Sequence, residues 1–258
     1  MSQDNNLYGL PNFLVIGAAR CGTTTLHEYL KFHPDIFVPK SKRPEPHFFL
    51  KNEEYSKGLE YYRSKYFKEH ANEKRIGEIS TSYLFNANAA KRIFDFNPEI
   101  KLVAMLRNPV DRTYSNYWHS VKNGIENESF DFAIQNESVR NEGLSETWKE
   151  IAPYAYLGRS KYDQQVTEYL RLFDRDQMHF ISFDDFIENT QAELKTLFNF
   201  LDVELDVEIS IPEIVNNTST PKNNDMDIDT RSFLSNYFNS SINALEHLID
   251  RDLSKWKS

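Results

Sequence analysis

Near its N-terminus the chain has a short apolar run that leads into a glycine-containing loop and then into a segment with helical spacing. Residues 12–17 read Asn-Phe-Leu-Val-Ile-Gly, and a continuous apolar run of this length predicts a buried strand of a parallel sheet. Gly17 and Gly22 frame the loop, and helical spacing follows over residues 24–32. In this order of elements, the first backbone N–H groups of the helix lie next to the loop, and together with the loop they can bind an anion.

The rest of the chain repeats the alternation of strands and helices. Apolar runs predict two more strands, and helical spacing predicts a series of helices. The strands are expected over 101–106 and 178–183, and the helices over 55–67, 88–96, 130–140, 161–173, 191–201 and, as one or two helices, 233–248. Another helix is expected to start after the strand at 101–106. Asn108 is typical of its N-cap, Pro109 of its first position and Asp111 of its first turn.

This alternation predicts an α/β protein: a P-loop-containing three-layer fold with a central parallel sheet flanked by helices. We expect a single domain over residues 1–258, because the length suits one domain and neither a repeat nor a boundary is visible. Residues 1–11 are expected to form a flexible N-terminal segment, 37–46 an exposed loop and 212–229 a mobile loop.

Charge and composition narrow the possible partners. Thirty Lys and Arg residues face 39 Asp and Glu residues, for a net charge of −9, which argues against a nucleic-acid-binding surface. A local basic pocket for a small anion remains compatible with this charge. The polar N-terminus lacks the features of a signal peptide, and no uncharged stretch reaches the ~18 residues of a membrane helix. We therefore expect a cytoplasmic protein without a membrane partner.

The loop itself favours a phosphate group over a nucleoside triphosphate. Residues 17–24, Gly-Ala-Ala-Arg-Cys-Gly-Thr-Thr, follow the P-loop pattern, but Thr23 occupies the position of the lysine that neutralises the β- and γ-phosphates in nucleotide hydrolases. Arg20 and the hydroxyls of Thr23, Thr24 and Thr25 suit a single 5′-phosphate. A βα turn without any ligand would also explain the segment, and the lone Cys21 is expected to be a small filler.

At these residues a family resemblance becomes clear. Residues 13–34 resemble the 5′-phosphosulfate-binding loop of sulfotransferases that use 3′-phosphoadenosine-5′-phosphosulfate (PAPS), particularly the carbohydrate type that includes heparan sulfate sulfotransferases and bacterial relatives. The resemblance implies PAPS as sulfuryl donor, with contacts from residues Arg20, Cys21, Gly22, Thr23, Thr24 and Thr25. Where relatives commonly carry a lysine, Arg20 keeps the charge but cannot donate a proton. Its expected role is electrostatic stabilisation of the leaving phosphate. If Arg20 does not have this role, Lys42 or Arg43 is expected to provide the positive charge.

A second segment resembles the motif that binds the 3′-phosphate in this family. Arg107 follows a predicted strand, and Ser115 comes eight residues later, about two turns into the next helix. A strand-end arginine can form forked hydrogen bonds to phosphate oxygens. Arg112 is better explained by a structural ion pair. Lys222, in the polar stretch 217–222, is expected to close over the same phosphate, although a polar linker explains that stretch equally well.

The catalytic base is expected in the sequence Pro-Glu-Pro-His-Phe-Phe at residues 44–49. It resembles the family segment whose glutamate deprotonates the acceptor, which implies that role for Glu45. His47 either assists Glu45 or packs beneath Phe48 and Phe49. Residues 77–84 resemble another family segment, with Ile79 where many relatives carry a lysine, which indicates a different acceptor environment.

The resemblance spans residues 13 to about 202 and implies in-line transfer of a sulfuryl group to a hydroxyl or amine of a carbohydrate or other small molecule. By analogy with phosphoryl transfer, catalysis would rest on positioning and charge stabilisation, without a metal ion. Two alternatives remain at this point. One is a P-loop nucleotide kinase or nucleoside triphosphatase, and the other is a nucleotide-binding module that has lost its activity.

Overall fold

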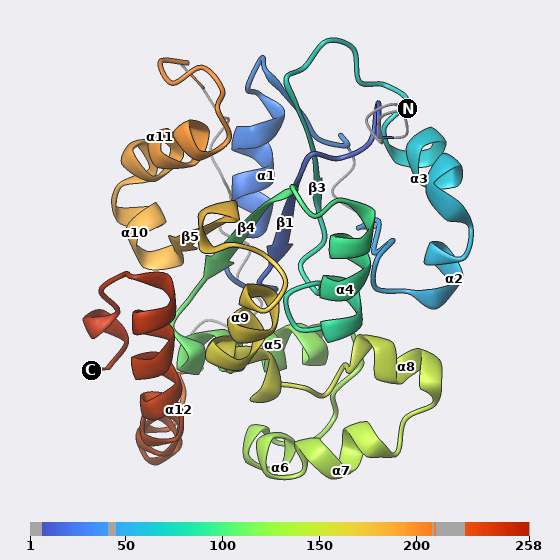
Figure 1. Ribbon diagram of the computed structural model, residues 1–258. Helices are drawn as coiled ribbons and strands as arrows, with labels where there is room; N and C mark the ends of the chain where they lie inside the picture. The colour runs from blue at the N-terminus through green and yellow to red at the C-terminus, as the bar shows by residue number, and fades with distance from the viewer. Residues whose placement is uncertain (1–6, 41–44, 208, 210–224, 258) are drawn as a thin grey trace. The chain divides into compact units, whose positions relative to one another are not determined.

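The structure is a computed structural model that describes residues 7–40, 45–207, 209 and 225–257 (Figure 1). The chain divides into two compact units. Unit 1 comprises Met1–Leu106 and Tyr169–Ile214, and unit 2 comprises Arg107–Glu168 and Val215–Ser258. The single-domain organisation over 1–258 stays a prediction.

Unit 1 contains a parallel sheet with the strand order β2-β3-β1-β4-β5. The strands are β1 (Phe13–Gly17), β2 (Ile36–Phe37), β3 (Arg75–Ile79), β4 (Lys101–Leu106) and β5 (Met178–Ser182). Every residue of β1 is buried, as a strand covered on both faces requires. The central parallel sheet flanked by helices confirms the predicted fold class.

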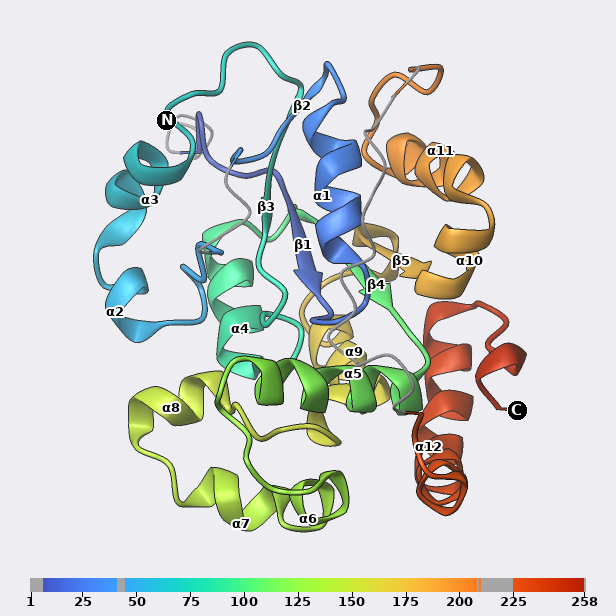
Figure 2. The ribbon, with the colours of Figure 1, turned by 180° about the vertical axis from the view of Figure 1, so that it is seen from behind.

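Helices cover both faces of this sheet. The chain moves toward one edge from β1 to β2 and toward the other edge from β3 to β4, so right-handed crossovers place the two intervening helices on opposite faces. Figures 1 and 2 show α1 and α4 in this arrangement. The helices of this unit are α1 (Thr23–Lys31), α2 (Asn52–Tyr55), α3 (Gly58–Tyr66), α4 (Ala87–Phe96), α10 (Phe183–Glu188) and α11 (Thr190–Phe200).

The helix expected over 55–67 is present as α3 but begins only at Gly58, which adopts a φ of 80° in the left-handed region, and Tyr55 is instead the last residue of α2. The loop over 37–46 was expected to be exposed, but among its described residues Phe37, Val38 and Pro46 are buried, whereas Lys40 is exposed. At the N-terminus, Leu10 is only 2% exposed, so the end of the segment 1–11 packs into the core.

Unit 2 is helical. It contains α5 (Pro109–Lys122), α6 (Phe130–Gln135), α7 (Glu137–Glu142), α8 (Glu146–Ile151) and α12 (Ile228–Ile249), and α9 (Tyr162–Leu170) crosses its sequence boundary with unit 1. The Asn108 side chain caps α5 by accepting a hydrogen bond of 2.9 Å from Val110 N–H, as predicted. An ion pair of 2.9 Å between Arg231 and Asp111 joins α12 to α5.

Some helix boundaries in unit 2 differ from the prediction. The expected helix 130–140 is interrupted at Asn136, which caps α7 and ends α6. The C-terminal helix is a single element that begins at Ile228, so the end of the loop expected over 212–229 is helical, while 212–224 lies outside the described residues. No helix in the described part of the chain is long and apolar enough to span a membrane.

Candidate active site

The loop between β1 and α1 has a backbone that turns sharply at two positions. Arg20 has a φ of 74° and Gly22 a φ of 86°, both in the left-handed region. A Cβ atom on Gly22 would lie 2.7 Å from the ring of Phe183, so close packing also demands glycine there. Gly22 is the N-cap of α1 and has no side chain with which to cap it. The first N–H groups of α1 are therefore suited to a ligand rather than to a side-chain cap.

The side chains of this loop differ in their exposure. Thr23 is buried, Thr24 is exposed, and Arg20 and Thr25 are half-buried. Cys21 is completely buried, its thiol donates to Ala19 O at 3.8 Å, and its amide donates to Ala18 O at 3.3 Å. The thiol thus fills space inside the loop, and the contacts of this loop with a cofactor stay a prediction.

The carboxylate of Glu45 accepts hydrogen bonds from Thr81, a residue of the loop that follows β3. Thr81 donates from its backbone N–H to Oε2 at 2.8 Å and from its hydroxyl at 3.1 Å. The Glu45 side chain is 23% exposed, so it is accessible to a ligand while its orientation is fixed. This combination suits a group that must accept a proton in a defined direction.

His47 lies beside Glu45, and the two phenylalanines that follow it belong to the core. His47 Nε2 is 3.6 Å from Glu45 Oε2, and the imidazole is 21% exposed. Phe48 and Phe49 are buried, and the ring of Phe48 stacks on Tyr62 with centroids 4.1 Å apart. His47 thus lies next to the proposed base, and its role stays a prediction.

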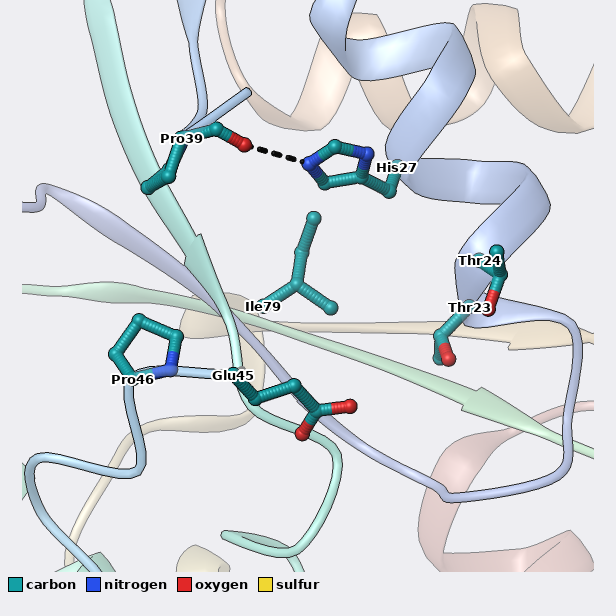
Figure 3. Close-up of a pocket in the computed structure, with 7 residues that line it drawn as sticks. All are labelled: Thr23, Thr24, His27, Pro39, Glu45, Pro46 and Ile79. Atoms are coloured by element: carbon teal, nitrogen blue, oxygen red, sulfur yellow. Dashed lines mark hydrogen bonds between the residues drawn. The ribbon is translucent and has the colours of Figure 1, made fainter. Parts of the chain in front are cut away.

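Glu45 and the phosphate loop line the same pocket (Figure 3). The carboxylate of Glu45 points toward Thr23 and Thr24 at the start of α1. The remaining lining residues are mostly apolar: His27, Pro39, Pro46 and Ile79. The structure thus brings together the predicted base and two of the predicted loop hydroxyls, whereas Arg20, Gly22, Thr25 and His47 are not among the residues that line this pocket.

Sequence reasoning did not identify His27 as part of the pocket. It is 4% exposed, and its Nε2 donates to Pro39 O at 2.8 Å, which ties α1 to the segment after β2. The sequence contained one indication of this role. His27 comes four residues after Thr23 and three after Thr24, a spacing that places the three side chains on the same face of a helix. A histidine at helical spacing is too common to single out without the structure.

A second carboxyl group, that of Glu78, lies on β3 behind the pocket. It is 0% exposed and accepts a hydrogen bond from the hydroxyl of Tyr62 on α3. Burial raises the pKa of Glu78 to about 7, against which the hydrogen bond from Tyr62 acts. Sequence reasoning missed this residue, because a glutamate in a strand gives no sign of its burial.

The remaining predicted residues are in unit 2 or outside the described residues. Arg107 is half-buried, and Ser115 is buried on α5. Arg112, for which an ion pair was expected, is fully buried and donates to Tyr156 O at 3.0 Å and to Ser160 Oγ at 3.1 Å. Lys42, Arg43 and Lys222 lie outside the described residues. Within the described ranges, no group of three or more His, Cys, Asp or Glu residues is placed to hold a metal ion.

Comparison with known proteins gives a consistent family assignment. Residues 10–242 match the sulfotransferase domain family. A sulfotransferase structure from Alicyclobacillus acidocaldarius is 31% identical with a TM-score of 0.80, and the alignment covers 96% of this chain and 99% of that one. The membrane-associated sulfotransferase kil1 of Dictyostelium discoideum is 27% identical over 99% of this chain and 68% of that protein.

Heparan sulfate glucosamine 3-O-sulfotransferase 3A1 of Mus musculus is 31% identical over 74% of this chain, and this chain covers 46% of that enzyme. The similarity to the mouse enzyme is therefore confined to less than half of its length. The family match and the bacterial structure, in contrast, extend over nearly the whole chain. The chain belongs to the sulfotransferase family.

Proposed function

We propose that this sulfotransferase moves the sulfuryl group of PAPS to a hydroxyl or amine of a carbohydrate or other small-molecule acceptor, with Glu45 as general base and without a metal ion. The observation that carries the proposal is the pocket in which the carboxylate of Glu45 faces Thr23 and Thr24. A base and an anion-binding helix terminus on opposite sides of one pocket are what in-line transfer between a donor phosphate and an acceptor requires.

The donor side of the site is assigned to the phosphate loop. The N–H groups at the start of α1 and the hydroxyls of Thr23, Thr24 and Thr25 would hold the 5′-phosphosulfate, and Arg20 would stabilise the charge on the leaving phosphate. Arg107 and Ser115 are proposed to bind the 3′-phosphate, together with Lys222. This second phosphate is what distinguishes PAPS from ordinary adenine nucleotides, and an arginine can hold it by forked hydrogen bonds.

The proposed step balances as a simple displacement. The acceptor oxygen or nitrogen forms a bond to sulfur while the bond between sulfur and the bridging phosphate oxygen breaks. The acceptor proton moves to Glu45, and the electron pair of the broken bond remains on the phosphate, beside the positive charges of the loop. A sulfuryl group has less negative charge than a phosphoryl group, so we propose that these protein groups suffice.

A carbohydrate is the first acceptor class to test. Relatives include heparan sulfate 3-O-sulfotransferases and a bifunctional N-deacetylase/N-sulfotransferase, whose names indicate transfer to sugar oxygen and nitrogen. In this chain the pocket beside Glu45 presents Pro39, Pro46 and Ile79. These apolar side chains would contact the carbon skeleton around the reacting group.

The decisive experiment is transfer of ³⁵S from labelled PAPS to a panel of acceptors that contains sugars, sugar amines, phenols and lipid alcohols. The reaction should continue in excess EDTA, and the variant Glu45→Gln should bind the product 3′,5′-adenosine bisphosphate as the parent does. Transfer that stops on chelation would refute the metal-independent mechanism. Failure to bind the bisphosphate would refute PAPS as the donor.

A further inference from the structure

His27 is a buried histidine that lines the same pocket as Glu45, and the proposed chemistry gives it no role. It lies on α1, about one turn after Thr23 and Thr24, so the helix that would hold the donor phosphate also carries the imidazole. Its Nε2 atom is 2.8 Å from Pro39 O. A carbonyl oxygen can only accept a hydrogen bond, so Nε2 must carry the proton. His27 therefore donates from the donor helix to the chain segment that follows β2.

The other ring nitrogen of His27 has a neighbour on its own helix. Nδ1 is 3.4 Å from Glu28 Oε1, and Glu28 Oε2 accepts a hydrogen bond of 2.9 Å from Lys31. The imidazole is thus placed between a carboxylate on one side and the Pro39 carbonyl on the other. Because the ring is also buried, its orientation is fixed and Nε2 stays directed at Pro39 O.

Pro39 lies at the point where the sheet stops holding this part of the chain. β2 is a two-residue strand at the edge of the sheet, and it ends at Phe37. The nitrogen of Pro39 carries no hydrogen, so this residue cannot donate a hydrogen bond to extend the pairing of β2 with β3. Val38 is buried, but the side chain of Lys40 is exposed. The hydrogen bond from His27 is therefore an anchor for the chain beyond β2.

Figure 3 shows where this hydrogen bond lies in the pocket. The pair formed by His27 and Pro39 is at one end of the view, and Glu45 is at the other. Ile79 lies between them, and all four residues line the pocket. An acceptor whose reacting hydroxyl or amine faces Glu45 extends from there toward Ile79. The hydrogen bond thus closes the pocket at the end that is far from the proposed base.

We propose that His27 is a positioning residue for sulfuryl transfer: by holding Pro39 against α1, it closes the far end of the acceptor pocket, which limits the size of the acceptor and excludes water. The inference rests on the proposed function. Exclusion of water matters because a closed site prevents the hydrolysis of a reactive group. His27 acts through Pro39 and contacts neither the sulfur nor the attacking atom.

The side reaction that His27 suppresses is hydrolysis of PAPS. A water oxygen forms the bond to sulfur while the bond between sulfur and the bridging phosphate oxygen breaks. One water proton moves to Glu45, the electron pair of the broken bond remains on the phosphate, and hydrogensulfate and 3′,5′-adenosine bisphosphate are the products. An opened pocket raises the rate of this reaction without any new catalytic group.

His33 provides a matched control in the same unit. It is also buried, and its Nε2 donates to Glu204 O at 2.9 Å, but it is not among the residues that line the pocket. The variants His27→Leu and His33→Leu each remove one hydrogen bond from a buried ring to a distant carbonyl. His27→Gln retains an N–H donor and should restore the bond to Pro39.

The first measurement is the release of labelled sulfate from ³⁵S-PAPS without an acceptor. We expect His27→Leu to release sulfate about 2- to 10-fold faster than the parent, the factor by which loss of one hydrogen bond raises the population of the open pocket. His27→Gln should stay within about twofold of the parent, and His33→Leu should equal it. Calorimetry should give all variants the parental affinity for 3′,5′-adenosine bisphosphate. Parental release by His27→Leu, or the same increase in His33→Leu, would overturn the inference.

Amide hydrogen exchange, measured by NMR, tests the anchor without reference to activity. Exchange at Val38 and Lys40, on either side of Pro39, should be faster in His27→Leu than in the parent, and parental in His27→Gln and His33→Leu. Unchanged exchange in His27→Leu would show that His27 does not hold Pro39. If the parent fails to bind 3′,5′-adenosine bisphosphate, the proposed donor is wrong, and the exchange rates still decide whether the anchor exists.

Discussion

The carboxylate of Glu45 accepts hydrogen bonds from both donors of one residue, the backbone N–H of Thr81 at 2.8 Å and its hydroxyl at 3.1 Å. Thr81 follows β3, so the proposed base is anchored to the end of a central strand rather than to its own loop alone. The same carboxylate points into the pocket, toward Thr23 and Thr24 (Figure 3). Donors of this kind preorganise a base without neutralising it.

Replacing Glu45 with glutamine should abolish most activity while preserving the fold. The amide has the same shape but cannot accept the acceptor proton, so kcat should fall by ~10²–10⁴-fold. Calorimetry with 3′,5′-adenosine bisphosphate should show parental affinity, because Glu45 faces the acceptor. Near-parental turnover would remove Glu45 from the mechanism and make His47 the candidate base.

Loss of the Thr81 hydroxyl should lower turnover without changing nucleotide affinity. A hydrogen bond to a charged group contributes about 1.5–3 kcal/mol, so Thr81→Val should reduce kcat by about 10-fold or more. Thr81→Ser keeps the hydroxyl and should retain most of the rate. Steady-state kinetics of the two variants test this prediction, and equal rates would show that the hydroxyl does not orient the base.

Two substitutions of Arg20 separate its charge from its shape. If charge on the leaving phosphate is stabilised by Arg20, Arg20→Lys should remain active, and Arg20→Met should lose ~10²–10³-fold in kcat. Single-turnover measurements exclude a masking effect of slow product release. If Arg20→Met reacts as fast as the parent, Arg20 belongs to the structure of the loop rather than to catalysis. The backbone of the loop turns sharply at this residue, where φ is 74°.

The 3′-phosphate should dominate nucleotide recognition. We expect 3′,5′-adenosine bisphosphate to bind far more tightly than AMP, because the extra phosphate gains charge-assisted hydrogen bonds from Arg107 and Ser115. Arg107→Ala should remove most of this difference and leave AMP binding nearly unchanged. Calorimetry measures both affinities, and equal binding of the two nucleotides by the parent would contradict the assignment.

Glu78 should make folding stability depend on pH in an unusual direction. Its pKa is raised from 4.5 to about 7 by burial, so between these values the native state binds more protons than the unfolded state. Stability must then fall as pH rises through this window. Between about pH 5 and pH 8 the contribution should decrease by on the order of 1–3 kcal/mol. Denaturant titrations should show this decrease in the parent relative to Glu78→Gln, and parallel profiles would contradict it.

The strands that sequence reasoning identified are those whose side chains are mainly apolar. Residues 101–106 form β4 as predicted, and 178–182 form β5. The strand β3 was not recognised, because Arg75, Gly77 and Glu78 interrupt its apolar pattern. The structure explains each exception: Arg75 pairs with Asp202 at 2.6 Å, and a Cβ on Gly77 would lie 2.1 Å from the ring of Phe13. These partners are distant in sequence, so no local pattern could reveal them.

The same distinction holds for the candidate site. Thr23, Thr24 and Glu45 could be proposed from short motifs, and the structure places them around one pocket. Thr81 lies in the segment 77–84 that resembles a family segment, but the sequence assigned it no role, because its hydrogen-bond partner Glu45 is 36 positions away. Motifs thus predict groups that contact ligands, whereas the groups that orient them emerge only from tertiary structure.

The sheet order has a consequence for how the protein is made. The strand that carries the phosphate loop is synthesised first of the five, yet it lies in the middle of the sheet, between β3 and β4. Until Lys101–Leu106 has left the ribosome, β1 has at least one edge without its partner, and such an apolar edge invites pairing with other chains. Nascent or truncated chains that end before β4 should therefore depend on chaperones, and a soluble fragment that retains the phosphate loop must extend beyond Leu106.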